Sequence, residues 1–412
     1  MIDPKEGLYE HAQFDGLRNN VPADRLALGD LTVATNVDID DSKRVSRRTG
    51  HSAAVLAGAY KSLWSNGATA LAVKAETSLV QIHPALTESV LRTGLTPGLD
   101  MSYTSPAALV YYSNGRETGV VEDSRSRTWG LAPPVAQPAA SATGGVLPAG
   151  RYQFAVTYLR RDGQESGTPR ASSIDLTDIG GISFSSIAVS SDPDVAHKAL
   201  YISKVNGQDL YRAGVIANGD TTFKYHADAF GTVPLWTQHL LPPPAGQVVG
   251  SFAGGYTLVG AGDTLYYSEP LALELFDYRK NLRFASPITM IADMDDGVYI
   301  GTQNQVLWLN GSDPQKWALT PKLSYGAIRG AMYFCSRDMV DADGKADEYA
   351  VFFATTQGLC VGMNGGSVSN VTQSRFSYPV QERGAALVRR HRGMVQGLVT
   401  LQGAVRAGNT AS

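Results

Sequence analysis

The sequence contains little cysteine and little charge. Of its 412 residues, two are cysteines, Cys335 and Cys360, and 18% are charged. Two cysteines exclude a scaffold held together by several disulfides and agree with folding in a reducing compartment. The formal net charge of −3 gives no general attraction for nucleic acid or for an anionic membrane surface.

Long apolar segments are also missing. No stretch of about 18 uncharged apolar residues occurs, so the sequence predicts no membrane-spanning helix. The segment Met1–Glu6 has no apolar run, and no secretory signal peptide is predicted. We therefore expect a protein that is made in a cytoplasm and is not embedded in a membrane.

The sequence motifs of common enzymes are absent as well. There is no G-x-S-x-G, H-E-x-x-H, C-x-x-C or G-x-x-x-x-G-K-[ST] pattern. The glycines between Gly254 and Gly262 lie between predicted strands and open no helix, so they are expected in turns and not around a phosphate. The seven histidines lie far apart, without the spacing of metal ligands. We predict that the protein is not an enzyme and has no catalytic residues, cofactor or metal.

Two acidic clusters are possible cation sites. Asp341, Asp343 and Asp347 flank Gly344 in a pattern similar to part of a calcium loop, in which several carboxylates meet on a tightly turning backbone. The segment lacks the twelve-residue spacing and the distal glutamate, so a solvated hairpin loop is favoured and calcium is the alternative. Asp293–Gly297 is interpreted in the same way, as a hairpin turn.

The abundant residues indicate many short strands. The chain has 43 glycines, 20 prolines and 19 tyrosines, and 43% of its residues are apolar. Apolar segments come in sets of about four, roughly 35–40 residues long, which is the size of a propeller blade. Asn66-Gly67 and Asn114-Gly115 are predicted as hairpin turns, because these residues supply the positive φ angles of tight turns. About five blades and a partial one are predicted, and the N-terminal segment could complete the partial blade; tandem sandwiches are the alternative.

The blade pattern is interrupted in the middle of the chain. Pro133-Pro134 opens a stretch rich in alanine, serine and glycine, and Pro242–Pro244 closes the interruption. Alternating strand patterns between them, as in residues 150–158, predict a small inserted β-sandwich. The predicted organisation is an N-terminal extended arm at 1–52, a first propeller part at 53–132, the insert at 133–245 and a second propeller part at 246–412.

Basic residues gather at Lys43–Arg48 and at Arg389–Arg392. Either group could contact phosphate or an acidic neighbouring subunit, and solvated strand edges are the alternative. Neither has the interleaved aromatic residues of a single-strand-binding groove. Arg44, Arg47 and Arg48 are the candidates for interface salt bridges. The arm around them is expected to be extended, with at most one short helical turn within residues 31–36.

Several segments together resemble a known family. The arm contains Phe14-Asp15-Gly16-Leu17, then Leu26 and Gly29-Asp30-Leu31, then Asn36-Val37-Asp38-Ile39-Asp40 and Arg47-Arg48. This combination resembles the N-terminal signature of the tail nozzle proteins of short-tailed bacteriophages, also called tail tubular or head-completion ("stabilisation") proteins. Residues 286–311 are similar to propeller segments of that family. Residues 147–152 and 162–167 are similar to the fibronectin-type sandwich that such proteins often carry.

The resemblance implies a fold and a function. The fold would be all-β, a β-propeller-like platform with an inserted fibronectin- or immunoglobulin-like β-sandwich. The protein would be a structural virion protein of the phage tail, made in the host bacterial cytoplasm. Its homo-oligomer, a hexameric ring in this family, would dock below the portal and adaptor at the head–tail connection and contact other tail proteins or fibres. Genomic DNA would pass through the lumen during ejection without specific binding, in agreement with the slight negative charge.

Two other functions are compatible with a propeller. One is a carbohydrate-binding or glycan-cleaving propeller acting as a receptor-binding tail component, which needs aromatic residues and paired carboxylates at a channel mouth. Ser312–Trp317 is similar to the Asp-box turn of sialidases, but Pro314 and Gln315 depart from that pattern. The other is a cellular protein-interaction propeller, for which no WD or kelch repeat is present.

Overall fold

The computed structural model describes residues 13–40, 42–48, 56–226, 231–253, 255–341, 343–373, 375–376, 378, 381–391 and 394–402. Within these residues the chain is all-β, with 33 strands and four single-turn 3-10 helices. The same residues include no helix of the length and apolarity needed to cross a membrane.

Five sets of four antiparallel strands form the main body, and we call them blades 1–5. Blades 1–4 are four-stranded sheets, and blade 5 is the larger part of a six-stranded sheet that a hairpin extends. In each blade every strand is hydrogen-bonded to the next strand in sequence. Blade 1 contains β5 (Tyr60–Ser65), β6 (Ala70–Lys74), β7 (Ser78–Ile82) and β8 (Glu88–Arg92), and blade 2 contains β9 (Ser102–Thr104), β10 (Val110–Ser113), β11 (Thr118–Glu122) and β12 (Arg125–Arg127). Blade 3 contains β20 (Val248–Phe252), β21 (Tyr256–Ala261), β22 (Thr264–Glu269) and β23 (Ala272–Arg283). Blade 4 contains β24 (Ile288–Met294), β25 (Gly297–Thr302), β26 (Val306–Asn310) and β27 (Ala318–Leu323), and blade 5 contains β28 (Ala327–Ser336), β29 (Tyr349–Thr355), β30 (Gly358–Met363) and β31 (Val368–Asn370).

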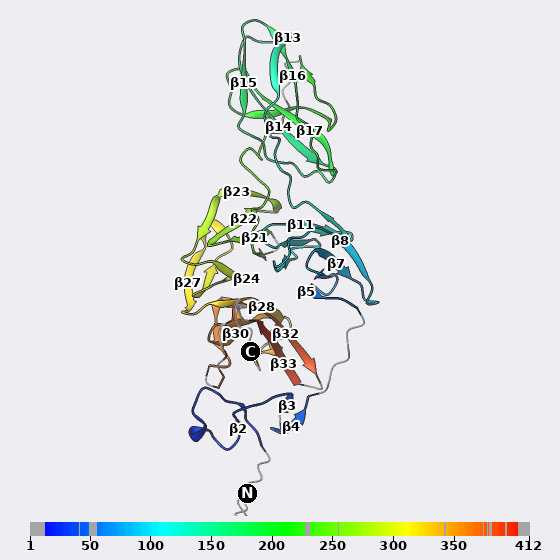
Figure 1. Ribbon diagram of the computed structural model, residues 1–412. Helices are drawn as coiled ribbons and strands as arrows, with labels where there is room; N and C mark the ends of the chain where they lie inside the picture. Colours follow the sequence, from blue (N-terminus) through cyan, green and yellow to red (C-terminus); the bar gives the residue numbers. More distant parts are fainter. Residues whose placement is uncertain are drawn as a thin grey trace, which may run out of the picture.

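The blades follow one another around a ring, from blue through green and yellow to orange in Figure 1. This arrangement of four-stranded antiparallel sheets is consistent with a β-propeller.

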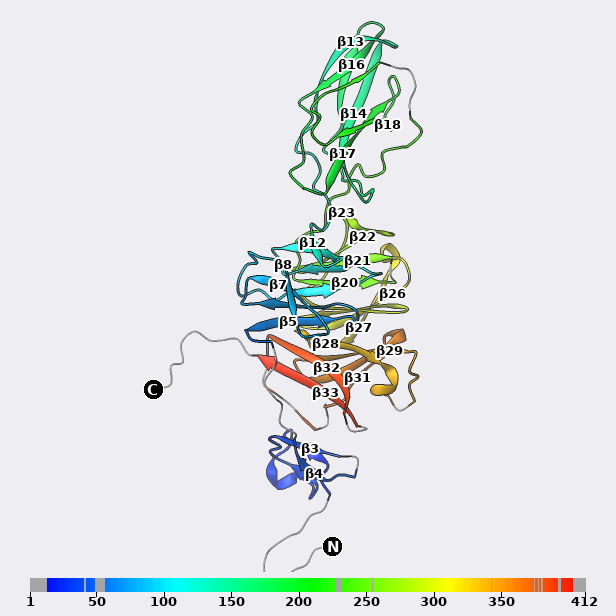
Figure 2. The ribbon, with the colours of Figure 1, turned by 90° about the vertical axis from the view of Figure 1, so that its right-hand side faces the viewer.

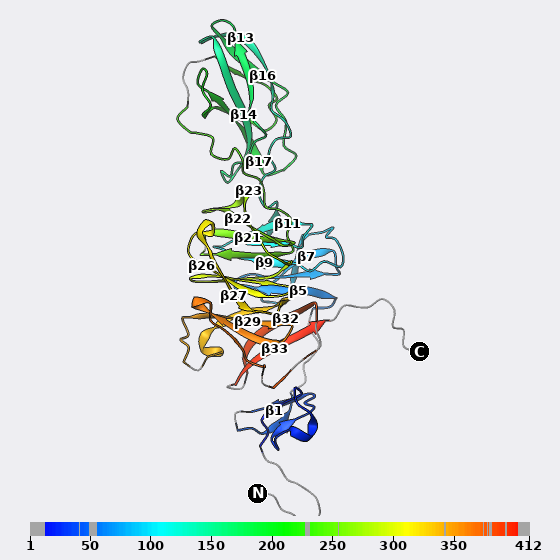
Figure 3. The same cartoon turned by 90° about the vertical axis from the view of Figure 1, so that its left-hand side faces the viewer.

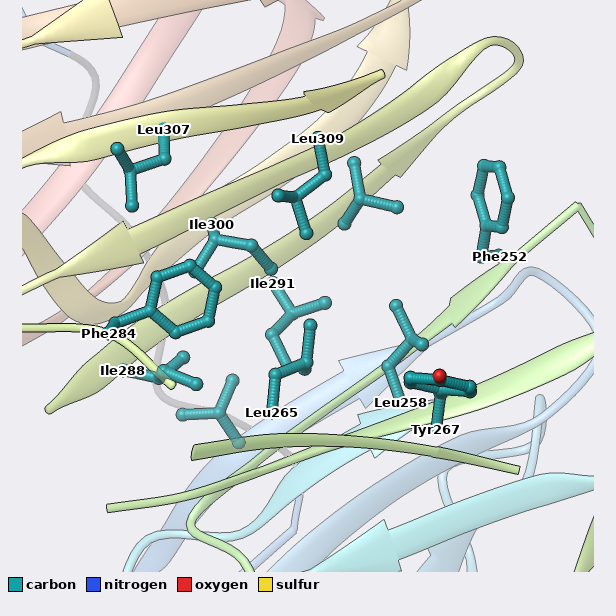
Figure 4. Close-up of a cluster of buried hydrophobic side chains, with 12 residues drawn as sticks. Phe252, Leu258, Leu265, Tyr267, Phe284, Ile288, Ile291, Ile300, Leu307 and Leu309 are labelled. Carbon is teal, nitrogen blue, oxygen red and sulfur yellow. The ribbon is translucent and has the colours of Figure 1, made fainter. Parts of the chain in front are cut away.

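Apolar side chains hold each blade against the next. The seam between blades 3 and 4, drawn in Figure 4, brings Leu258 and Leu265 against Ile291 and Ile300, and all four side chains are at most 1% exposed. Corresponding seams join blades 1 and 2, blades 2 and 3, and blades 4 and 5. Burial of one such side chain stabilises the fold by about 1.5–3 kcal/mol, so the seams account for the stacking of the sheets.

A two-stranded hairpin covers blade 5. Strands β32 (Arg383–His391) and β33 (Met394–Gln402) pair over their full length, and β32 touches β28 at a single parallel position. The buried Val388 of β32 packs against Cys335 and Phe352 of blade 5. The hairpin thus occupies the position of a sixth blade with two strands.

The insert contains two sheets around its own core. One sheet contains β13 (Ala139–Leu147), β16 (Gly180–Ser185) and β19 (Phe223–Tyr225), and the other contains β15 (Ser172–Leu176), β14 (Gly150–Arg160), β17 (Val195–Ser203) and β18 (Leu210–Ala217), each in that order. Tyr152, Phe154 and Phe184 lie in the core between the two sheets. Residues 139–147 were expected to be a break in the strand pattern, but they form β13; alanine and glycine have low strand propensity, so this strand is hard to predict.

The N-terminal segment forms two small pairs of strands. β1 (Gly16–Leu17) pairs with β2 (Asp30–Leu31), and β3 (Val37–Ile39) pairs with β4 (Val45–Arg47). These pairings do not complete a blade, contrary to the expectation above. The expected helical turn at 31–36 is also wrong, since the 3-10 turn η1 lies at Ala23–Arg25.

The molecule is elongated. Figures 2 and 3 show the insert at one end of the blades and the N-terminal segment at the other end. The two modules therefore extend in opposite directions from the ring of blades.

Candidate functional site

The predicted interface arginines lie on the N-terminal segment. All three residues of β4 are exposed, and so are Arg44 and Arg48 beside it. The Arg48 Nε donates to Asp38 Oδ1 at 3.0 Å within the same segment. Among the described residues the side chains of Arg44 and Arg47 have no ion-pair partner, so these two cations face solvent.

Residues of the family-like pattern hold this segment together. The side chain of Asp30, which is 3% exposed, pairs with Arg18 at 3.1 Å and with Arg375, which follows blade 5, at 3.7 Å. Arg375 also donates to the Asp15 carbonyl, and its own carbonyl accepts from the Asn19 amide. A Cβ at Gly29 would lie too close to the Asp15 carboxylate, so a larger residue there would displace that side chain.

The second basic cluster is partly neutralised. Arg390 pairs with Asp338 at 2.5 Å, and Arg389 donates to Gln396 across the hairpin. Arg392 lies outside the described residues. This cluster therefore offers less free positive charge than its sequence indicates.

The acidic clusters form ion pairs and hydrogen bonds that hold loops in place. The Arg337 guanidinium bridges Asp341 at 2.9 Å and Glu348 at 2.5 Å, and this pairing lowers the pKa of Asp341. Asp295 and Asp296 accept hydrogen bonds from the 3-10 turn η4 (Asn364–Gly366) of blade 5. In the part of the chain that the structure describes, no group of three or more histidine, cysteine or acidic residues is arranged to hold a metal.

A buried charge cluster joins the insert to the blades, and we call it the joint. The Glu274 carboxylate of β23 accepts from Arg127 of β12 at 2.7 Å and from Arg160 of β14 at 3.1 Å. The side chains of the two arginines are 4% and 2% exposed, and that of Glu274 is 7% exposed. Burial lowers the pKa of Arg127, but hydrogen bonds to Glu274 outweigh it, so the pKa is raised overall. The Arg127 guanidinium is therefore charged.

The chain enters and leaves the insert side by side at the joint. Gly130 has a φ of +78°, and a Cβ there would lie 2.9 Å from the Pro242 side chain. Its amide also donates to Glu274. On the far side of the joint, Arg125 pairs with Asp194 of the insert at 2.9 Å. The insert is thus held by several contacts and not by its two linkers alone.

A polar groove lies where the returning linker meets blade 3, and we call it the linker groove. It consists of two cavities of about 230 and 370 Å³ that share Glu269 and Lys280, whose side chains form an ion pair at 2.6 Å. The first cavity is lined also by Tyr256, Tyr267, Ser268, Pro270, Asp313 and Gln315. The second is lined also by Leu235, Trp236, Gln238, His239, Leu240, Asp277 and Arg279.

Aromatic packing shapes the first cavity. Trp317 makes edge contacts with Phe252 and Tyr267, and its indole N–H donates to the Gly311 carbonyl at 2.8 Å. Within the described chain, the hydroxyls of Tyr256 and Tyr267 have no hydrogen-bond partner. Burial, followed by the charges of Asp313 and Glu269, raises the pKa of both phenols, so they are protonated donors beside carboxylate acceptors.

The second cavity has an exposed indole. Trp236 is 56% exposed, while Leu235 beside it is fixed by a 2.8 Å hydrogen bond from its amide to the Leu210 carbonyl. Asp277, with a side chain 7% exposed, pairs with Arg279 at 2.7 Å. None of these lining residues was predicted as a site from the sequence, and of the Asp-box-like segment only Asp313 and Gln315 line the groove.

Comparison with known proteins gives distant structural similarity alone. No protein-family model matches the sequence, and no curated protein matches it. Among solved structures, the BBS1 N-terminal domain in a complex with ARL6 is similar at 11% identity and a TM-score of 0.31, covering 85% of this chain and 92% of that one. AztD from Citrobacter koseri is similar at 12% identity and a TM-score of 0.30, with coverages of 82% and 89%. Sqt1 from Saccharomyces cerevisiae is similar at 11% identity and a TM-score of 0.21, with coverages of 70% and 91%. At these scores the similarities carry no argument about function.

Proposed function

We propose that the protein is a tail nozzle subunit of a short-tailed bacteriophage, a structural component of the DNA exit channel. The observation that carries the proposal is the placement of the N-terminal segment. The segment with the family-like pattern is a separate small body at one end of the blades, tied to the chain after blade 5 by Asp30 and Arg375. Its exposed strand β4, together with the arginines on either side of it, suits docking onto an acidic surface of an adaptor.

The insert agrees with the immunoglobulin- or fibronectin-like sandwich that such a subunit would carry. Its seven strands form sheets in the orders 1-4-7 and 3-2-5-6, counted from β13. The four-stranded order is that of the C′-C-F-G sheet of immunoglobulin-like domains, if β13 takes the role of strand B. We assign the insert to this class; its last strand, β19, would then pair beside strand E.

The charge balance supports a conduit. A lumen through which DNA slides should not hold phosphate tightly, because each neutralised phosphate strengthens binding. The net charge is −3, and many arginines are paired with carboxylates within the chain. The family that the sequence resembles forms hexameric rings. In such a closed ring the channel is made by all subunits together, so no single subunit needs an active site.

Native mass spectrometry of the full chain, alone and mixed with the portal–adaptor complex of its virus, tests the proposal. We expect a closed ring on that complex. Replacing Arg44 and Arg47 together by glutamate should weaken docking by about ten-fold or more, because like charges would then face the adaptor. The matched control is Arg151→Glu, an exposed arginine at the opposite end of the molecule. A chain that stays monomeric and does not bind the complex at low salt would contradict the proposed function.

A further inference from the structure

The linker groove offers room for part of a small molecule. Its two cavities, about 230 and 370 Å³, lie next to each other and share the ion pair Glu269–Lys280 in their linings. The larger one falls within the range of volumes found for small-molecule clefts. The groove does not touch the joint residues Arg127 and Arg160, so it is a feature separate from the attachment of the insert.

The polar groups of the groove match neutral hydroxyls better than ions. Each charged pair is already compensated: Lys280 by Glu269, and Arg279 by Asp277. An anionic or cationic ligand would have to break such a pair and leave one partner uncompensated. A hydroxyl both donates and accepts, so it can bind between a carboxylate and a cation without displacing either.

The phenols add directed donors. Tyr256 and Tyr267 present hydroxyls without a partner in the described chain, next to Glu269 and Asp313. Several convergent donors and acceptors at fixed positions are the usual source of orientation and specificity in a binding cleft.

The exposed indole supplies an apolar platform beside these polar groups. Trp236 lies at the second cavity with 56% of its surface exposed, on backbone that Leu235 fixes by its hydrogen bond to Leu210. A ring with a broad electron-rich face packs well against the C–H face of a pyranose, and the fixed backbone beside Trp236 limits what must be ordered on binding to the indole side chain itself.

We propose that the linker groove binds a neutral oligosaccharide, with one sugar ring stacked on Trp236 and hydroxyls bound by Glu269, Lys280 and the two tyrosines. The binding would be non-catalytic and would place a glycan contact on the side of the molecule, where the insert meets blade 3. It is separate from the proposed adaptor contact, because none of these residues belongs to the N-terminal segment.

An array of neutral and acidic bacterial surface oligosaccharides, incubated with the full chain, tests the proposal. We expect neutral glycans to be bound, and we expect saturation-transfer NMR with a bound glycan to show contact with an indole. Trp236→Ala should weaken glycan binding about ten-fold or more, as expected for loss of a tryptophan anchor. Trp236→Phe, which keeps an aromatic ring, should retain most of the native affinity. Glu269→Gln should weaken binding several-fold while keeping the shape of the cavity.

The matched control is Tyr349→Ala, an aromatic residue of blade 5 that is 59% exposed. This substitution should change neither glycan binding nor ring assembly on the portal–adaptor complex. Absence of any bound neutral glycan, binding of acidic glycans only, or equal binding by Trp236→Ala would each overturn the proposal. Thermal unfolding of each variant verifies that the fold is retained.

Discussion

Glu274 accepts hydrogen bonds from Arg127, Arg160 and the Gly130 amide while its side chain is 7% exposed. Two guanidinium groups share this one buried carboxylate, although Glu122 adds a second, more exposed acid to Arg127. Removal of one partner from a buried pair leaves an uncompensated charge, which costs far more than the pair itself contributes.

Glu274→Ala is therefore expected to lower the free energy of unfolding by about 3–5 kcal/mol. Urea unfolding followed by the tryptophan fluorescence of the chain, to which Trp129 beside the joint contributes, measures the change. The control is Arg125→Ala, since Arg125 is 60% exposed in its pair with Asp194 and its loss should cost less than about 1 kcal/mol. Equal effects of the two substitutions would show that the joint is not held by its buried charges.

The residues of the joint and of the linker groove were not predictable as sites from sequence. Glu274 is a single acid in an apolar run, which is a weak signal of a buried charge, and nothing in the sequence indicates its partners Arg127 and Arg160. The groove combines Trp236 of a linker with Glu269 of blade 3 and Asp313 of blade 4. Side chains so far apart in sequence meet only because of the packing of whole blades.

At the scale of elements, hairpins were predicted well, although the turn chemistry differs from the expected one. Asn66 and Asn114 each begin a four-residue loop in which the asparagine side chain accepts two backbone N–H groups. Only the following glycines have positive φ angles. The turns at Ala75-Glu76 and Asp123-Ser124 have positive φ without any glycine, so the residue that usually marks such a turn in a sequence is missing from both.

The hairpin β32–β33 protects a thiol of blade 5. Val388 is buried against Cys335, which is 6% exposed, and burial raises the pKa of Cys335 to about 11. A protonated, covered thiol reacts slowly with disulfide reagents. Val388→Asp should force the hairpin open, because an unpaired carboxylate is costly in an apolar contact.

We expect the Cys335 thiol of the Val388→Asp variant to react with a disulfide reagent at least about ten-fold faster than in the native protein. Cys360, which is fully buried between blades 4 and 5, should stay unreactive until the chain unfolds. Leu387→Asp is the control on the opposite face of the same strand, where Leu387 is 41% exposed, and it should change nothing. An unchanged rate for Val388→Asp would mean that the hairpin does not protect Cys335.

At the scale of the whole molecule, the insert should be an independent folding unit. Its core of Tyr152, Phe154, Phe184 and their neighbours lies between its own two sheets. A fragment of residues 133–245 is expected to unfold cooperatively in urea and to give a dispersed amide NMR spectrum.

The fragment of residues 53–132 provides the contrast. It contains blades 1 and 2 but lacks blade 3, so Tyr111 and Trp129 would be exposed at an unfilled seam. We expect this fragment to aggregate or to bind a hydrophobic dye. If it folds as well as the insert does, the seams are not what stabilises the ring of blades.

The side-by-side entry and exit of the chain at the joint also has a consequence for the order of folding. The Val249 amide of blade 3 donates to Ser102 of blade 2, which is 147 positions away in sequence. If the insert folds first, Gly130 and Pro242 are already adjacent, and the open loop between blades 2 and 3 shrinks from more than a hundred residues to about ten. The entropy cost of closing that loop then falls by about 2 kcal/mol. The insert would in this way act early, as a clamp that brings the two parts of the ring together before any blade of the second part has formed.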